Sequence, residues 1–554
     1  MNKEISSLVK KNNIVVTELN QLLHNEGIEF HERMNIIIHV IHSKYYHKSF
    51  HDTIPHHLKE KLFGYINSLS IDKNEIFQKV FMFYGHKNTK INLDQYYTPF
   101  TIGKFMCDMC HASKTIIDPA CGTGDLIVNY DGVIHGWDIS KEVLHVCEDN
   151  FKMHQKKFHL QHHNSIEMYN KDDASYDYAC LNPPFGTSTV ITDQEILNQY
   201  ELGKTKKKQE IGILFMERTM RLLKKDGIAL MIVPNGYLGN SSNNTEQLRN
   251  YLLSLRVIAI IELPPNTFSR SGTGVSTSLL LIQNTKTNCP YNIYMKKIHN
   301  IGYILNKKNT PYKYKMSRGN YILHNNKPIL DNDLEECVCE LMDFCFHEKI
   351  TQLRSQSNNS CDYNIVNTND LKKTILDAKQ YERNYKNIVA SMKEFKKIKD
   401  FLQNDYATDF IKESNKKYLY LDIKQITSPI YKKENILYGH ELPQRGKHMV
   451  RKYDILVSKL LGTISFTIIL NDQDNIVCTN GFCVLRPKDY KSAVLIFGNL
   501  FLNEFKIQHH AQCRGSIMEN IMESSLKDIY INENVDFKKY DNLIQALRVI
   551  QTEL

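Results

Sequence analysis

The segment with the clearest chemical potential is Asn182-Pro183-Pro184-Phe185, which directly follows the apolar run 178–181. Two consecutive prolines cannot pair in a sheet and disfavour a helix, so a buried strand must end here in a stiff turn. The Asn182 side chain and the Pro183 carbonyl offer acceptors, and Phe185 offers a flat apolar face. Such a turn suits a planar group that bears an exocyclic amine, because two acceptors take its hydrogens while the ring stacks on it. That chemistry requires no metal site; the alternative is a proline-rich turn with a buried Phe.

A second pair of signals lies upstream of this turn. The apolar run 115–117 opens into Asp118-Pro-Ala-Cys-Gly-Thr-Gly-Asp125, where glycines let the backbone turn sharply and approach a ligand. The next apolar run, 132–137, ends in Asp138, about 20 residues after the start of the glycine-rich turn. An acidic residue at the tip of a second strand can bind the two hydroxyls of a ribose; the alternative is that Asp138 caps the next helix. The sequence therefore favours a nucleoside-like cofactor.

Composition limits the class of protein. The 554 residues predict about three domains, and the net charge of +9 with a pI near 8.7 is compatible with nucleic acid as a partner. The 13 scattered cysteines are odd in number, as expected of reduced thiols. Neither a signal-peptide pattern nor an apolar stretch of about 20 residues is present, so we expect no membrane span and a cytoplasmic location, in a bacterium or in a viral factory.

The pattern of apolar residues changes along the chain and predicts four parts. Residues 1–90 have helical spacing and predict a helical domain. Residues 91–290 alternate short apolar runs with helical segments, which is typical of an α/β fold with a parallel sheet. Residues 291–370 predict a peripheral extension and linker, and residues 371–554 predict spacer helices followed by an α+β domain with short strands.

The order of these motifs resembles that of amino-group DNA methyltransferases, and specifically the modification subunit of type I restriction systems. The resemblance rests on Asp118–Asp125, on Gly136-Trp-Asp138 and on Leu181-Asn-Pro-Pro-Phe-Gly186. Upstream, Gln95-Tyr-Tyr-Thr-Pro99 is similar to the segment that packs over the methionine end of the cofactor in that family. Downstream, the series continues through Phe215-Met-Glu217 to Gly274-Val-Ser-Thr277.

The resemblance implies a Rossmann-like methyltransferase core that uses S-adenosyl-L-methionine to methylate the N6 amine of a flipped adenine in duplex DNA. Asn rather than Ser at the first position of the tetrapeptide favours adenine over cytosine. The implied catalytic residues are Asn182, Pro183, Pro184 and Phe185, and no metal is implied. The implied cofactor-binding residues are Gln95, Tyr96, Thr98, Pro99, Asp118, Ala120, Gly122, Thr123, Gly124, Asp125, Asp138, Ile139 and Asn164, with Asp138 on the ribose.

The C-terminal part resembles one target-recognition domain of a type I specificity subunit. Its strands are expected near 418–423, 454–458, 467–470 and 482–486, and the loop Gln444-Arg-Gly-Lys-His448 offers side chains that read base edges. One such domain implies a monomer on a short asymmetric site or a homodimer on a bipartite site. A restriction subunit is compatible but not required. The run Lys204-Thr-Lys-Lys-Lys208 contacts phosphates or is a solvated charge run.

Two other functions stay open on the sequence. The same turn could present a different planar amine, namely cytosine N4, an RNA base or a protein glutamine. The chain could instead be a non-autonomous DNA-recognition subunit of a restriction or defence complex. The intact motif residues and the specificity-like domain favour a site-specific adenine DNA methyltransferase, EC 2.1.1.72.

Overall fold

The computed structural model describes thirteen stretches of the chain, which form two compact units within residues 1–378 and 379–554. The described residues are 15–46, 56–67, 76–88, 98–167, 173–184, 189–269, 274–305, 311–358, 361–404, 408–461, 464–471, 475–515 and 519–553.

A mixed sheet of nine strands forms the centre of the first unit, in the order β15-β10-β8-β9-β7-β4-β1-β2-β3. Strand β9 runs antiparallel to both of its neighbours and β15 runs antiparallel to β10, while the other pairs are parallel. The strands are β1 (Thr115–Asp118), β2 (Val133–Asp138), β3 (Lys157–His162), β4 (Tyr176–Leu181), β7 (Leu223–Pro234), β8 (Leu255–Glu262), β9 (Thr277–Lys286), β10 (Asn292–Lys297) and β15 (Ile365–Asn367). This is the α/β architecture that the sequence predicts.

Parallel pairing brings the carboxyl ends of three strands to one edge of the sheet. Strand β1 ends at Asp118, β2 ends at Asp138, and β4 ends directly before Asn182. Because β1 lies between β2 and β4, these three ends are neighbours, although the residues are far apart in sequence. Ligands of open α/β sheets bind outside such carboxyl ends.

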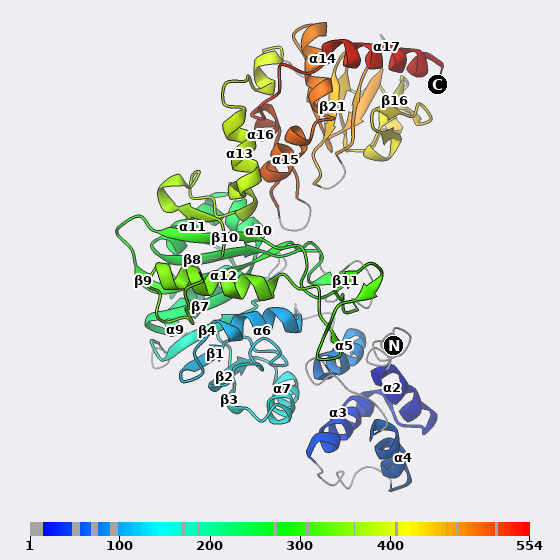
Figure 1. Cartoon of the computed structure of the whole chain (residues 1–554). Helices are drawn as coiled ribbons and strands as arrows, with labels where there is room; N and C mark the ends of the chain where they lie inside the picture. Colours follow the sequence, from blue (N-terminus) through cyan, green and yellow to red (C-terminus); the bar gives the residue numbers. More distant parts are fainter. Residues whose placement is uncertain are drawn as a thin grey trace. The chain divides into compact units, whose positions relative to one another are not determined.

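Helices cover both faces of the sheet (Figure 1). On one face, α6 (Phe100–Asp108), α7 (Lys141–Met153) and α12 (Leu334–His347) share one apolar core with the sheet. On the other face, α9 (Ile211–Leu222) packs on β4 and β7, and α11 (Asn243–Leu253) packs on β8. The short elements near these helices are α8 (Gln194–Leu197), α10 (Asn235–Gly239), β5 (Val190–Ile191) and β6 (Gln209–Glu210).

The helical pattern expected before residue 90 is present as α2 (Val15–Asn25), α3 (Phe30–Tyr46), α4 (His56–Asn67) and α5 (Ile76–Asn88). Their apolar faces form a cluster that also includes Val143, Val146 and Met153 of α7. The bundle therefore packs on the α/β core through the outer side of α7. In the described part of the chain, no helix is both long and apolar enough to cross a bilayer.

The sheet continues beyond residue 290, where the sequence pattern predicts only a peripheral extension. Strand β10 pairs in parallel with β8, β15 closes the edge, and α12 packs beneath them, so much of 291–370 belongs to the core. The apolar run of β10, Ile293-Tyr-Met295, is only three residues long and is flanked by polar residues, so the apolar pattern alone did not mark a strand. The rest of the segment carries two small hairpins, β11 (Met316–Ser317) with β12 (Asn320–Tyr321), and β13 (Leu323–His324) with β14 (Lys327–Pro328), followed by the short helix η3 (Thr368–Asp370).

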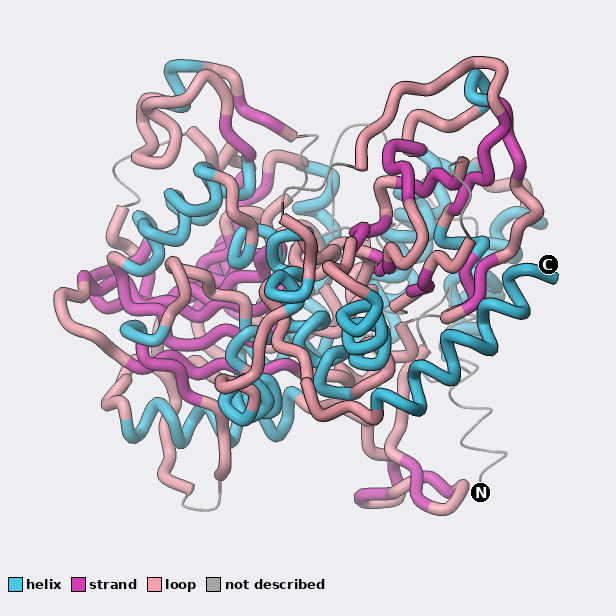
Figure 2. Tube along the Cα trace, turned by 90° about the horizontal axis from the view of Figure 1, so that it is seen from above, coloured by secondary structure: helices cyan, strands magenta, loops and turns pink. Residues whose placement is uncertain are grey.

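The second unit has an α+β fold. One sheet has the order β19-β16-β23-β20, a second has the order β22-β21-β24, and β17 pairs with β18. The second sheet shares an apolar core with α14 and α17, and α17 runs to the C-terminal end of the chain (Figure 2). The strands are β16 (Lys417–Leu421), β17 (Ile426–Thr427), β18 (Ile430–Tyr431), β19 (Ile436–Tyr438), β20 (Gly446–Val450), β21 (Ile455–Ser458), β22 (Phe466–Ile468), β23 (Ile476–Thr479) and β24 (Phe482–Leu485). The helices are η4 (Ala378–Tyr381), α13 (Arg383–Ser391), η5 (Ile398–Phe401), η6 (Ile423–Gln425), η7 (Gly439–Glu441), α14 (Tyr490–Asn499), α15 (Asn503–Gln512), α16 (Glu523–Lys527) and α17 (Phe537–Glu553).

Candidate functional site

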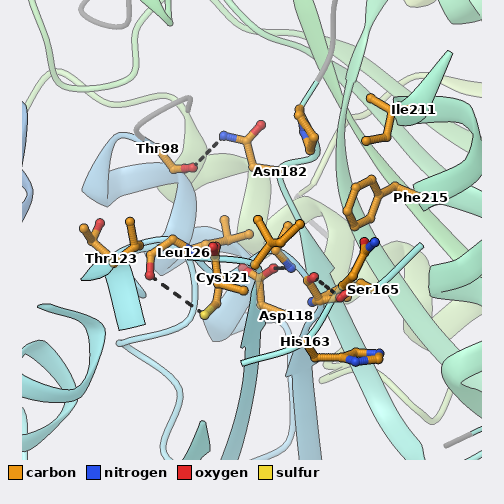
Figure 3. A pocket seen from close by; sticks show the side chains of 18 of the residues that line it. Thr98, Asp118, Cys121, Thr123, Leu126, His163, Ser165, Asn182, Ile211 and Phe215 are labelled. Carbon is orange, nitrogen blue, oxygen red and sulfur yellow. Dashed lines mark hydrogen bonds between the residues drawn. The ribbon is translucent and has the colours of Figure 1, made fainter. Parts of the chain in front are cut away.

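A cavity of about 220 Å³ lies at the carboxyl ends of β1, β2 and β4 (Figure 3). Of the residues that the sequence predicts for cofactor binding, those that line it are Thr98, Asp118, Ala120, Gly122, Thr123, Asp125, Asp138, Ile139 and Asn164. Of the predicted catalytic residues, Asn182 and Pro184 line it. Pro99, Gly124 and Pro183 are adjacent in sequence to lining residues without lining the cavity themselves. Gln95, Tyr96 and Phe185 lie outside the described residues.

The glycine-rich turn that follows β1 has two glycines in the left-handed conformation. Gly122 has φ +52°, and a Cβ added there would meet nothing within 4 Å, so the backbone is open toward the cavity. Gly124 has φ +82°, and a Cβ added there would lie 2.7 Å from the ring of Phe151 on α7. The first glycine gives a ligand close access to the backbone, whereas the second lets the turn pack on α7.

Asp138 holds the end of β2 against the glycine-rich turn. Its Oδ2 accepts the backbone N–H of Gly122 at 2.9 Å, and its Oδ1 accepts that of Ser140 at 2.9 Å. Burial is the first cause of the raised pKa of this carboxyl, and the backbone hydrogen bonds oppose it. The N-cap of α7 is Ser140, whose Oγ accepts from Val143, so Asp138 is not the cap. Each carboxylate oxygen has a second lone pair, which a ribose hydroxyl can use.

Asp118 is a buried carboxyl at the centre of the cavity wall. Its Oδ1 accepts the backbone N–H of Ala120 at 3.0 Å, but burial raises its pKa to about 8. Asp125, also buried, accepts the hydroxyl of Thr123. Buried carboxyls favour a cationic ligand, because a positive charge would stabilise their ionised form.

The opposite part of the cavity is more apolar and includes residues that sequence reasoning did not assign. Phe215 and Ile211 enter it from α9, and Ile166 enters it after β3. Phe215 belongs to a motif of the resemblance, so the sequence did contain a signal for it. A flat ring can pack on these side chains. Asn164 is less available, because its Nδ2 donates to Glu167 at 3.0 Å.

Other lining residues that the sequence did not single out are Gln78, Pro119, Cys121, Leu126, Val143, His163, Ser165 and Thr189. Ser165 donates to the Pro119 carbonyl, which fixes the segment after β3 to the glycine-rich turn. Gln78 comes from α5 of the helical bundle, where no sequence signal marked a site residue.

The side chain of Asn182 is held at the other end of the cavity. Its Nδ2 donates to the hydroxyl of Thr98 at 3.0 Å, and Figure 3 shows the carbonyl oxygen on the other side of the amide. Pro184 and Tyr237 lie close to Gly212, and the hydroxyl of Tyr237 donates to Glu210 at 2.9 Å. The arrangement places an amide acceptor in the same cavity as the buried carboxyls.

The sequence profile described as N-6 DNA Methylase matches residues 74–373, which is more than half of the chain. The curated methylase subunit of the type I restriction enzyme EcoEI from Escherichia coli is 24% identical over 213 residues. That alignment covers 34% of this chain and 42% of that protein, so the chain matches less than half of the length of this relative.

Solved structures show weaker likenesses. The type I restriction-modification methyltransferase subunit from Streptococcus thermophilus has 15% identity and a TM-score of 0.38, covering 61% of this chain and 74% of that one. The type IIG restriction endonuclease BpuSI has 12% identity and a TM-score of 0.49, covering 97% of this chain and 72% of that one.

Proposed function

Because this chain belongs to the N-6 DNA methylase family, we propose that it transfers a methyl group from S-adenosylmethionine to the N6 amine of adenine in duplex DNA. The observation that carries the proposal is that Asn182 lines the same cavity as Asp118 and Asp138. An acceptor for the amine of a base and carboxyls suited to a cationic nucleoside therefore line one cavity.

The donor set of the cavity fits S-adenosylmethionine. The cofactor carries a cationic methionine end, a ribose diol and a flat ring. Asp118 would lie near the cationic end, Asp138 would accept from the ribose hydroxyls, and Phe215 with Ile166 would pack against the ring. When bound, the cofactor supplies an electrophilic methyl group.

The catalytic turn would hold the base by its amine. The Oδ1 of Asn182 and the carbonyl of Pro183 would accept the two amine hydrogens, which favours the positive charge that develops on the nitrogen. Reaching the amine requires the adenine to leave the duplex, at a cost of a few kcal/mol. Stacking on Phe185, which lies outside the described residues, would offset about 1–3 kcal/mol of that cost. Positioning is then the main source of rate.

A labelling experiment tests this reaction. Purified protein is incubated with methyl-labelled S-adenosylmethionine and mixed-sequence duplex DNA, and the labelled nucleoside is identified after digestion. We expect labelled N6-methyldeoxyadenosine, lost in Asn182→Ala and kept in the control Asn369→Ala, an exposed residue of η3. Label on deoxycytidine would show that cytosine, and not adenine, is the target base. Unlabelled DNA despite cofactor binding would contradict an enzyme that acts without a partner.

We also propose that the second unit recognises the DNA sequence. Its support is the exposed segment that leads into β20, where Gln444, Arg445 and Lys447 face solvent and can reach base edges in the major groove. His448 is a poorer reader, because its Nδ1 lies 2.8 Å from the hydroxyl of Thr408. Arg445→Ala should weaken binding to the recognised site by about 1–3 kcal/mol and relax its sequence at one position. An unchanged site preference would contradict this role for Arg445.

A lysine-rich turn precedes α9 and supports contact with the DNA backbone. Lys206, Lys207 and Lys208 line a hollow with Asn243 and Asn244, and two of these lysines are exposed. The turn leads through β6 into Ile211, which lines the cavity. Phosphates beside a base in that cavity would meet this turn. The proposed reaction uses only residues of this chain and the cofactor, so it would not require a restriction subunit.

A further inference from the structure

The amide of Asn182 is held by a short series of buried hydrogen bonds that starts in the helical bundle. Gln78 of α5 donates through Nε2 to the backbone carbonyl of Thr98 at 2.9 Å. The hydroxyl of Thr98 in turn accepts Nδ2 of Asn182 at 3.0 Å. Gln78 and Thr98 are only 1% and 5% exposed, so water competes little with either bond. Thr98 thus contacts the residue that the proposed function places on the base, and Gln78 holds Thr98.

Thr98 is itself held on its C-terminal side. It precedes α6, whose N-cap is Pro99, and the hydroxyl of Thr101 in the first turn of α6 donates to the carbonyl of Ile301 at 2.7 Å. The backbone at Thr98 is therefore fixed by Gln78 and by the anchored start of α6. The Thr98 hydroxyl that holds the amide nitrogen therefore lies on an anchored segment of backbone.

The two ends of an amide have opposite hydrogen-bonding roles. The oxygen accepts and the nitrogen donates, so only one of the two orientations of Asn182 presents an acceptor to the amine of a base. In the other orientation, two N–H donors would face two N–H donors. With Nδ2 bonded to Thr98, Oδ1 lies on the other side of the amide (Figure 3). With this bond in place, the amide lies in the orientation that the proposed reaction needs.

We infer that Thr98 and Gln78 are positioning residues for the amide of Asn182, and that α5 of the helical bundle is part of the methyl-transfer site. The inference rests on the proposed methyl transfer. It gives Thr98 a role separate from the expected packing over the cofactor, and it gives the bundle a role beyond covering α7.

Isosteric variants separate this role from cofactor binding. Thr98→Val removes the hydroxyl and keeps the shape, whereas Thr98→Ser keeps the hydroxyl. We expect Thr98→Val to lower kcat about threefold to tenfold, the size of one hydrogen bond, with the Kd for S-adenosylmethionine changed less than about twofold. Thr98→Ser should restore kcat. The measurements are kcat at saturating cofactor and DNA, and cofactor binding by calorimetry.

Gln78→Met tests the second bond with a side chain of similar length. It should lower kcat by about twofold to fivefold at unchanged cofactor affinity. The matched control is Val80→Ala, which removes a buried side chain from the same helix without touching Thr98. Val80→Ala should lower the melting temperature and leave kcat unchanged.

Three results would overturn the inference. The first is a raised Kd at unchanged kcat in Thr98→Val, which would make Thr98 a cofactor contact only. The second is equal kcat in the Val and Ser variants. The third is additive shifts in melting temperature for Thr98→Val, Asn182→Ala and the double variant, because residues in contact should give a smaller combined shift. This third test does not depend on activity, so it also decides the contact if the wild-type chain leaves DNA unmethylated and the proposed function itself fails.

Discussion

The buried carboxyl of Asp118 predicts that cofactor affinity rises with pH. Burial raises the pKa of this group from 3.8 to about 8, so at neutral pH the ligand-free cavity holds mostly the protonated acid. A cation beside Asp118 favours the ionised form, and binding below pH 8 must therefore release a proton. The free energy of binding consequently includes the cost of that ionisation, which falls as pH rises.

The size of the effect follows from the pKa. If only the ionised carboxyl binds, affinity at pH 6 is about 100-fold below its limit, and at pH 7 about tenfold below it. Above pH 9 the dependence disappears. Since the folded-state pKa lies above the unfolded value of 3.8, the same group favours folding below pH 4, and that contribution is lost as pH rises through 8.

Calorimetric titration with S-adenosylmethionine from pH 6 to 9 measures the dependence, with Asp118→Asn as the matched variant. Asn keeps the acceptor for the Ala120 N–H and has no charge to titrate. The cofactor's own amine titrates equally in both proteins, so the ratio of their affinities isolates Asp118. A ratio that is constant from pH 6 to 8 would refute the reasoning, and so would proton uptake on binding.

Three further predictions concern the turn, the DNA contact and the second unit. Gly124→Ala should cost about 1–3 kcal/mol in unfolding and weaken cofactor binding, because its Cβ would overlap a ring of α7; Gly122→Ala, which has open space, should lower the melting temperature less. Lys208→Gln should reduce the slope of log K against log salt for DNA binding by about 0.9 if it neutralises one phosphate, and an unchanged slope would assign it to solvent. Asp454→Asn should destabilise the second unit by about 3–5 kcal/mol, since it leaves the buried guanidinium of Arg486 without its carboxylate; urea unfolding measures the loss, and a change below about 1 kcal/mol would contradict it.

The parts of the site that could be predicted from sequence are those encoded by adjacent residues. Three local patterns are of this kind: a strand that ends in a glycine-rich turn, a strand that ends in Asp138, and a strand that ends in two prolines. Parallel pairing then brings their ends together without further information. For the same reason, the α/β core was predictable.

Long-range packing could not be predicted in this way. Gln78 reaches the cavity from a helix whose sequence shows only amphipathic spacing, and Ile211 reaches it because α9 packs on β4 and β7. Strand β10 was missed because its apolar run, Ile293-Tyr-Met295, is only three residues long and is flanked by polar residues. These features depend on contacts between segments that are distant in sequence, and the pattern of either segment alone does not contain them.

The distribution of charge in the cavity explains why an amide, and not a carboxylate, stands at the catalytic turn. The ionisable groups Asp118 and Asp138 lie where a cationic cofactor would be held, whereas Asn182 contacts the neutral hydroxyl of Thr98. A carboxylate at position 182 would accept hydrogen bonds from an amine more strongly. It would also be an anion and a nucleophile next to an electrophilic methyl group, and so would compete with the base for it. In the proposed reaction, a neutral acceptor held by Thr98 would leave the nitrogen of the base as the nucleophile for the methyl group.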